Sequence, residues 1–101
     1  MNGDDLAHVV TAIVPAYERP DYLVEAVTSA LAQTYPHVEV LVGDDSRTDA
    51  VEQAVRAIDD PRVRYHRNSP SLGAMGNWID LVRRARTPLV ASLNDDDRWE
   101  P

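Results

Sequence analysis

The residues best suited to chemistry stand near the end of the chain, where an apolar run meets clustered acids. Leu89 to Leu93 is typical of a buried strand, and the polar run Asn94 to Asp97 follows it directly. In open α/β sheets, ligands bind outside the carboxyl ends of the strands. Mg²⁺ and Mn²⁺ prefer oxygen ligands and share their coordination with phosphates. The cluster therefore predicts a metal–phosphate site, with a solvated loop before a helix N-terminus as the alternative.

Other polar candidates follow two further apolar runs. Asp44 and Asp45 end one of them, and a strand-end carboxylate can accept a hydrogen bond from a ribose hydroxyl or a pyrimidine N–H. A turn with ordinary side-chain capping explains the same pair. Tyr17 could stack on a nucleobase or pack as a half-buried residue. Asn77 could reach the same edge or cap a helix, and Trp78 beside it is more typical of a core.

The apolar pattern alternates between strand and helix periods. It predicts strands over Val9 to Val14, Val38 to Val42, Val63 to His66 and Leu89 to Leu93. Between them, helical spacing predicts a helix from Asp21 to Gln33, one containing Val51, Ala54, Val55 and Ile58, and one containing Met75, Ile79, Val82 and Ala85. Pro20 fits a first helical turn, and Thr48 or Asp49 could cap the second helix.

The predicted order is βαβαβαβ. That order implies an α/β fold, a three-layer Rossmann-like open parallel sheet with right-handed crossovers and helices on both faces. We expect one domain over residues 1–101. In such a sheet the ends of the first, second and fourth strands share one edge, so the three polar groups should converge.

Composition narrows the class of partner. The 101 residues include 10 basic and 17 acidic side chains, for a net charge of −7. This charge argues against nucleic acid and implies that an anionic ligand needs a cation beside it. The chain has no cysteine and no lysine, which excludes thiolate metal sites, Walker-type phosphate loops and Schiff-base chemistry. No transmembrane segment or secretion signal is evident, so we expect a cytoplasmic location.

The order and spacing of these blocks resemble a known family. The run VTAIVPAYERPDYLVEAVTSALAQTYPHVEVLVGDDSRTD, residues 10–49, resembles the opening of a family 2 glycosyltransferase, the large inverting class with the GT-A fold. The resemblance continues through Asn68, Gly73 and Asn77-Trp78 and ends at SLNDDDRWEP, residues 92–101. It implies the N-terminal half of such an enzyme, which binds a nucleotide-diphosphate sugar, most simply a UDP-sugar.

The resemblance also implies roles for single residues. Pro15, Ala16 and Tyr17 would line the base and ribose pocket. Asp45 would contact the base, with Asp44 beside it holding the turn.

Residues 94–96 occupy the place of the family's Asp-X-Asp motif. Asp95 would lie near the ribose and the metal, and Asp96 would ligate Mg²⁺ or Mn²⁺ through the diphosphate. The metal would act as a Lewis acid on the leaving nucleotide diphosphate. Asn94 departs from the acid often found at the first position, and Asp95 and Asp97 could compensate.

The parent reaction implied is inverting glycosyl transfer to a hydroxyl or lipid-linked acceptor, at the cytosolic face of the membrane where the acceptor is a lipid. Family members continue past this point with an acceptor-binding half that carries the general base. We therefore expect the base beyond Pro101 and the chain alone to bind donor without transfer.

Rival interpretations are a nucleotidyltransferase-like domain, for which a basic Gly-rich segment is missing, and a non-catalytic nucleotide-binding or interaction module. A receiver-type signalling domain fits poorly, because it needs a late lysine. The uncharged last strand further predicts a homodimer through an exposed sheet edge.

Overall fold

The computed structural model describes residues 9–33, 37–87 and 89–93. Within these ranges the elements follow the predicted alternation. They are β1 (Val10–Ala16), α2 (Pro20–Leu31), β2 (Val38–Asp44), α3 (Ala50–Ile58), β3 (Val63–Arg67), α4 (Gly73–Arg84) and β4 (Leu89–Ser92). None of the helices described is long and apolar enough to cross a membrane.

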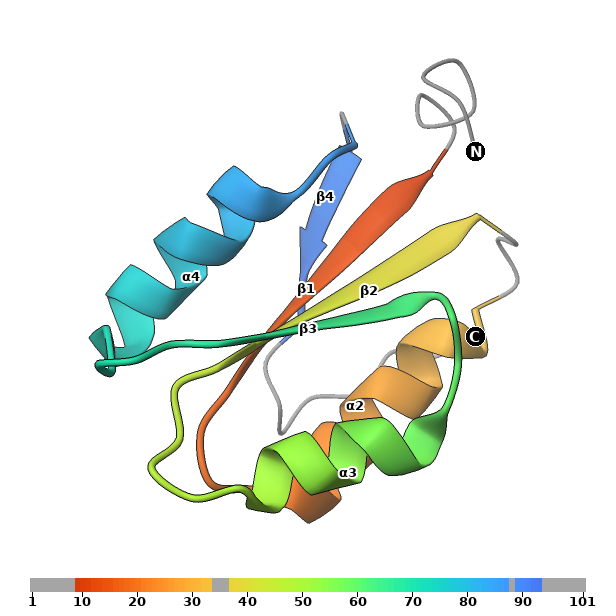
Figure 1. The fold of residues 1–101 in the computed structure, drawn as a ribbon. Coiled ribbons are helices and arrows are strands. Elements are labelled where there is room, and N and C mark those ends of the chain that lie inside the picture. The colour runs from red at the N-terminus through yellow and green to blue at the C-terminus, as the bar shows by residue number, and fades with distance from the viewer. Residues whose placement is uncertain (1–8, 34–36, 88, 94–101) are drawn as a thin grey trace.

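The described strands form one parallel sheet in the order β3-β2-β1-β4. Helices α2 and α3 cover one face of this sheet, and α4 covers the other (Figure 1). The chain moves from β1 to β2 to β3 in one direction with its helices on one face. It then returns to β4 with its helix on the opposite face, so every crossover has the same hand, as parallel sheets require. The predicted three-layer fold is confirmed.

The central strands are apolar because both of their faces are covered. All residues of β2 are buried, and β1 is buried at five of its seven positions. Beneath α2 and α3, a large core joins alternate residues of these strands, such as Val14 and Val42, to Leu23 and Val27 of α2. The core under α4 is much smaller and contains Ile13, Leu41 and Leu81.

Two local expectations were wrong. Strand β1 does not stop before Pro15 but runs on to Ala16, where the missing N–H falls near the strand end and interrupts little of the ladder. Helix α3 has Asp49 at its N-cap position without a side-chain cap. The Asp49 carboxylate instead accepts a hydrogen bond from Arg67, and the Thr48 hydroxyl donates to Glu18, so tertiary partners outcompete local capping.

Helix α4 is rotated so that its apolar stripe faces outward. Trp78, expected in the core, is 41% exposed and donates a hydrogen bond from Nε1 to Ser92 Oγ at 3.2 Å. The buried face of α4 carries Asn77 and Leu81. Asn77 donates from Nδ2 to the carbonyl oxygen of Gly43 and accepts at Oδ1 from Asn68. These two polar contacts set the rotation of the helix, because a buried amide without partners is costly.

Gly43 allows this close approach of α4 to β2. A Cβ atom on Gly43 would lie 2.6 Å from Asn77 Oδ1 and 2.7 Å from Leu81 Cδ2. Such separations are shorter than van der Waals contact, so any side chain would push α4 away from the sheet.

We predict that Gly43→Ala lowers the free energy of unfolding by about 1–3 kcal/mol through overpacking. Urea denaturation of the two proteins measures the loss. The double variant Gly43→Ala/Leu81→Ala should lose less stability than the sum of the two single losses, because the shortened side chain removes the contacts with Leu81 and leaves only the one with Asn77. Strict additivity would contradict the packing argument.

Candidate functional site at the carboxyl edge of the sheet

The loops that follow β1 and β2 are tied together at the carboxyl edge of the sheet. The backbone N–H of Asp45 donates to the carbonyl of Ala16 at 3.0 Å. A second bond lies further along both loops, where the N–H of Glu18 donates to Ser46 Oγ at 2.8 Å. Glu18 has a φ of 51°, a left-handed conformation unusual for a residue with a long side chain. The loops therefore have one relative position, which is what a preformed binding edge needs.

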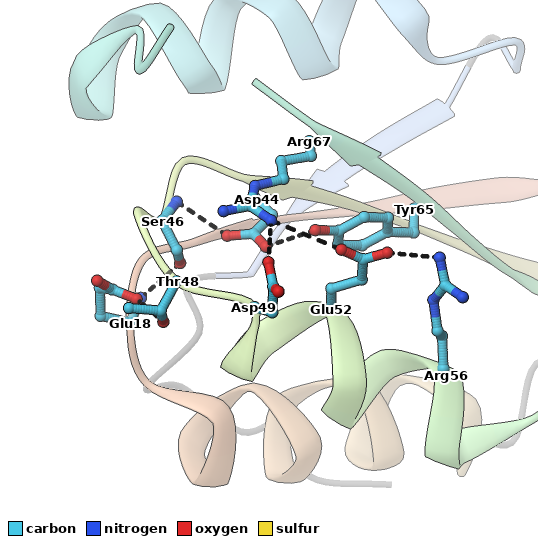
Figure 2. Close-up of polar contacts among 9 residues, drawn as sticks. All are labelled: Glu18, Asp44, Ser46, Thr48, Asp49, Glu52, Arg56, Tyr65 and Arg67. Carbon is cyan, nitrogen blue, oxygen red and sulfur yellow. Dashed lines mark hydrogen bonds and ion pairs between the residues drawn. The ribbon is translucent and has the colours of Figure 1, made fainter. Parts of the chain in front are cut away.

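Asp44 belongs to the layer of α2 and α3. It is fully buried, and its Oδ1 accepts the backbone N–H of Ser46 at 2.9 Å while Oδ2 accepts the hydroxyl of Tyr65 at 2.6 Å. Figure 2 shows Asp44 between these partners, which come from the following loop and from β3. Burial raises the pKa of Tyr65, and the hydrogen bond to Asp44 raises it further. Asp44 is thus an acceptor with its partners already inside the protein.

An ion-pair chain extends this network along α3. Arg67 Nη1 lies 2.5 Å from Asp49 Oδ1 and 3.6 Å from Glu52 Oε1, and Glu52 in turn pairs with Arg56 at 2.5 Å (Figure 2). Sequence reasoning missed Tyr65 and Arg67. Their spacing of two within β3 places both on the face that Asp44 also uses, and this alternation is the signal that could have found them.

Asp45 points into the opposite layer, toward the start of α4. Its Oδ1 accepts hydrogen bonds from Asn68 Nδ2 at 3.0 Å and the N–H of Leu72 at 2.7 Å. Its Oδ2 accepts from Ser71 Oγ at 2.5 Å and the N–H of Gly73 at 2.9 Å. A carboxylate offers about four acceptor positions, so the segment before α4 occupies them all.

These contacts make Asp45 a cap for α4 supplied from another element. Leu72 is the N-cap residue of α4 and offers no side-chain cap, while Gly73 begins the helix with a φ of 78°. The first N–H groups of a helix have no partner within it. The Asp45 carboxylate provides the partner for two of them, and its negative charge is favourable at a helix N-terminus.

Opposing effects act on the Asp45 side chain, which is only 4% exposed. Burial raises the pKa of its carboxyl, but the hydrogen bonds from Ser71, Leu72, Asn68 and Gly73 together outweigh burial and hold the pKa below its usual value. Asp45 therefore stays ionised near neutral pH.

The other sequence-predicted residues differ in exposure. Ala16 is 2% exposed and Asn77 is 2% exposed, while Tyr17 at the end of β1 is 51% exposed. Pro15 is partly buried within β1. Asp95 and Asp96 lie outside the described residues, which end at Leu93. The N–H of Leu93 donates to the carbonyl of Ile13 at 2.9 Å. The chain thus leaves Leu93 at the carboxyl edge, beside β1.

A divalent cation would find few ligands among the carboxylates described. In residues 9–33, 37–87 and 89–93, no three His, Cys, Asp or Glu side chains gather as a metal site. At the carboxyl edge, Asp44 and Asp45 already accept hydrogen bonds at both oxygens. Asp44 and Asp45 could therefore ligate a metal only by giving up some of these hydrogen bonds.

Comparison with known proteins finds a matching family model and several similar proteins. The family model described as glycosyl transferase family 2 matches residues 11–101. The chain is 34% identical over 91 residues to the Escherichia coli UDP-Glc:alpha-D-GlcNAc-diphosphoundecaprenol beta-1,3-glucosyltransferase WfaP, covering 90% of this chain and 36% of that protein. It is 41% identical over 92 residues to the Rhizobium meliloti succinoglycan biosynthesis protein ExoO, covering 91% and 26%.

Solved structures agree with the fold. The mannosyltransferase PcManGT from Pyrobaculum calidifontis, in complex with GDP-Man and Mn²⁺, superposes with a TM-score of 0.81 at 28% identity. That match covers 91% of this chain and 28% of the neighbour. Staphylococcus aureus TarS shares the fold with a TM-score of 0.76 at 22% identity, covering 89% of this chain and 28% of TarS residues 1–349. The chain thus spans only about a quarter to a third of these proteins.

The Asp45 contacts predict a pH dependence of stability. A carboxyl whose pKa is lower in the folded state stabilises the fold fully above its unfolded pKa, about 3.9, and this contribution is lost as the pH falls through the folded value. We predict that wild-type stability falls on acidification below about pH 4, and that Asp45→Asn, which cannot ionise, shows a smaller fall. Denaturation between pH 7 and pH 2.5 measures both.

The matched control is Asp59→Asn. Asp59 is exposed at the end of α3 in the left-handed conformation, which asparagine adopts readily. Its pH profile should follow the wild type. At pH 7, Asp45→Ala should lower the free energy of unfolding by about 2 kcal/mol, because it leaves buried N–H groups unpaired. Equal acid sensitivity in wild type and Asp45→Asn would contradict the role assigned to this carboxylate.

Proposed function

Because the chain belongs to glycosyl transferase family 2, we propose that it binds a nucleotide-diphosphate sugar with a divalent cation at the carboxyl edge of the sheet. The observation that carries this proposal is the convergence of three strand ends. Asp45 is bonded to Ala16 at the end of β1, and Leu93, which follows β4, is bonded to Ile13 in the middle of β1, so the three parallel strands all run toward one edge. Ligands of open α/β sheets bind outside such edges.

The nucleoside part of the donor is proposed to lie against the end of β1. Tyr17 supports this assignment, because half of its surface is exposed at the edge and a tyrosine ring can stack on a base. Pro15 and Ala16 would contribute backbone contacts to the base and ribose. Asp44 would keep the turn in place from within the protein.

A base contact by Asp45 requires an exchange of partners. All four acceptor positions of its carboxylate are taken by residues 68–73. A ring N–H of uracil, thymine or guanine would have to displace one of these donors or share it. Asn77 lies beneath this layer, bonded to Gly43 and Asn68. We therefore propose that it acts on the donor through the Asn68–Gly73 segment.

The diphosphate and the metal are assigned to the acids that follow Leu93. We propose that Asp95 lies near the ribose and the metal and that Asp96 ligates Mg²⁺ or Mn²⁺. A cation there offsets the repulsion between a diphosphate and a chain of net charge −7. When bound, it would act as a Lewis acid that stabilises the departing nucleotide diphosphate.

The names of related proteins indicate the substrate class. WfaP is named for UDP-Glc and a lipid diphosphate acceptor, and PcManGT was solved with GDP-Man and Mn²⁺. We propose a UDP-sugar as donor and inverting transfer to a hydroxyl of a lipid-linked acceptor, on the cytoplasmic side, as the reaction of the full enzyme.

Self-association is proposed at the outer edge of β4. Among the described strands, β4 pairs with β1 alone. Leu89 is 57% exposed and Val90 is 41% exposed, and β4 carries no charged side chain that would discourage pairing. A second copy that pairs through the same edge would form a symmetric dimer.

We predict metal-dependent binding of UDP. Calorimetry should give an affinity at least about tenfold higher with Mn²⁺ than with EDTA, equivalent to 1.4 kcal/mol. Asp96→Asn should remove most of this difference, and Asp59→Asn should keep it. GDP titrated in parallel tests the choice of base. Binding that is equal in EDTA would favour a metal-free binding module, and the absence of nucleotide binding would favour a pure interaction module.

We predict dimer formation through the β4 edge. Sedimentation velocity should show a sedimentation coefficient that rises with protein concentration. Val90→Lys should abolish the rise, because an edge lysine opposes strand pairing. Val24→Lys, on α2 at a similarly exposed apolar position, is the control and should behave as wild type. A wild-type chain that stays monomeric at high concentration would overturn the proposal.

A further inference from the structure

A cavity of about 210 Å³ lies at the amino edge of the sheet, opposite the edge discussed above. Its lining includes Glu39 near the start of β2, Arg62 and Arg64 around the start of β3, and Arg86 before β4. Parallel strands start at one edge and end at the other. A ligand here would therefore be separate from the proposed donor.

The net charge around this cavity is positive, whereas the net charge of the whole chain is negative. Arg64 Nη1 lies 2.5 Å from Glu39 Oε1, and Arg86 Nη2 lies 3.2 Å from the same oxygen. Arg62 pairs with Asp60 at 2.9 Å. Three guanidinium groups thus share two carboxylates. This surplus of positive charge stands in a chain whose net charge is −7.

The arginines are held in place by the fold. Glu39 is 8% exposed on β2, and Arg64 extends from the neighbouring strand β3 on the same face. Arg86 precedes Thr87, whose hydroxyl bonds to Thr11 Oγ1 of β1 at 2.8 Å and to the carbonyl of Leu89 at 2.7 Å. The backbone beside Arg86 is therefore anchored to the sheet.

Both arginines beside Glu39 keep hydrogen-bonding capacity. A guanidinium has five N–H donors. Within the described part of the chain, hydrogen bonds engage Nη1 alone of Arg64 and Nη2 alone of Arg86. Their side chains are 36% and 55% exposed, so the remaining donors are accessible from the cavity side. Paired guanidinium groups with unused donors match the geometry of phosphate oxygens.

Stability alone gives little reason for this arrangement. Ion pairs whose arginine side chains are 36% and 55% exposed contribute little to stability. The small core under α4, formed by Ile13, Leu41 and Leu81, could extend to this edge with apolar residues instead. A charged cluster beside an open cavity is better explained by a ligand of opposite charge.

We infer that the cavity bounded by Arg62, Arg64, Arg86 and Glu39 binds a small phosphate-type oxyanion. Arg64 and Arg86 supply the donors, and Glu39 bridges the two guanidinium groups and holds them in position when the anion is absent. The site is independent of the divalent cation. The anion could be free phosphate or the diphosphate of a nucleotide, which share this chemistry.

Phosphate titration of the ¹⁵N-labelled chain in EDTA tests the inference, with sodium chloride adjusted to constant ionic strength. Inorganic phosphate should give saturable amide shifts around Glu39, Arg64 and Arg86. Arg86→Gln should weaken binding about fivefold, the value of about 1 kcal/mol for an exposed charge pair. Arg56→Gln, whose partner Glu52 lies outside the cavity, should bind as wild type. Arg64→Gln replaces Arg86→Gln if circular dichroism shows that the latter is unfolded.

Glu39→Gln gives a result of opposite sign. Removal of the competing carboxylate should tighten phosphate binding by about fivefold, whereas a cluster with a purely structural role would gain no affinity. A UDP titration in EDTA identifies a nucleotide diphosphate as the source if it shifts the same amides. Absence of saturable shifts at the amino edge, or shifts that Arg86→Gln leaves unchanged, would overturn the inference. Neither result depends on metal-assisted binding at the carboxyl edge.

Discussion

The carboxylate of Asp45 is the contact on which the carboxyl edge depends. Burial of this charge is unfavourable, and four hydrogen bonds from residues 68–73 offset it. Two of the donors are backbone N–H groups at the start of α4, a helix with no side-chain cap of its own. A single side chain at the end of β2 thereby sets where α4 begins.

The acid pair after β2 serves two layers because successive residues of a strand point to opposite faces. Asp44 bonds to Tyr65 and Ser46 on the side of α2 and α3, and Asp45 bonds to the segment before α4. Both acids are therefore structural acceptors before any ligand arrives. The Tyr17 ring at the same edge differs from both acids in that half of its surface is exposed.

The order of elements could be predicted from the sequence because it depends on local periodicity. Leu23, Val27 and Ala30 have helical spacing, and they are buried as their pattern requires. The same periodicity misled at Trp78, because it shows that a helix has an apolar face but not that this face meets the sheet.

The missed contacts are those between residues distant in sequence. Arg86 reaches Glu39, 47 positions away, and Thr87 reaches Thr11, 76 positions away. No local pattern predicts such pairs, since they exist only after β4 takes its place beside β1. The hydrogen bonds that occupy the Asp45 carboxylate could not be predicted for the same reason. Asn68, Ser71 and Leu72 approach it only after the chain crosses to the other face of the sheet.

The polar network and the exposed apolar face have one origin. Asn77 must face the sheet to bond to Gly43 and Asn68. On a helix, this rotation carries Met75, Trp78 and Ile79 outward, where they are 71%, 41% and 40% exposed. Trp78 then reaches Ser92 of β4, which among the described strands pairs with β1 alone. The contacts that order the carboxyl edge therefore also create the surface through which we expect the chain to associate, because large exposed apolar patches mark interaction sites.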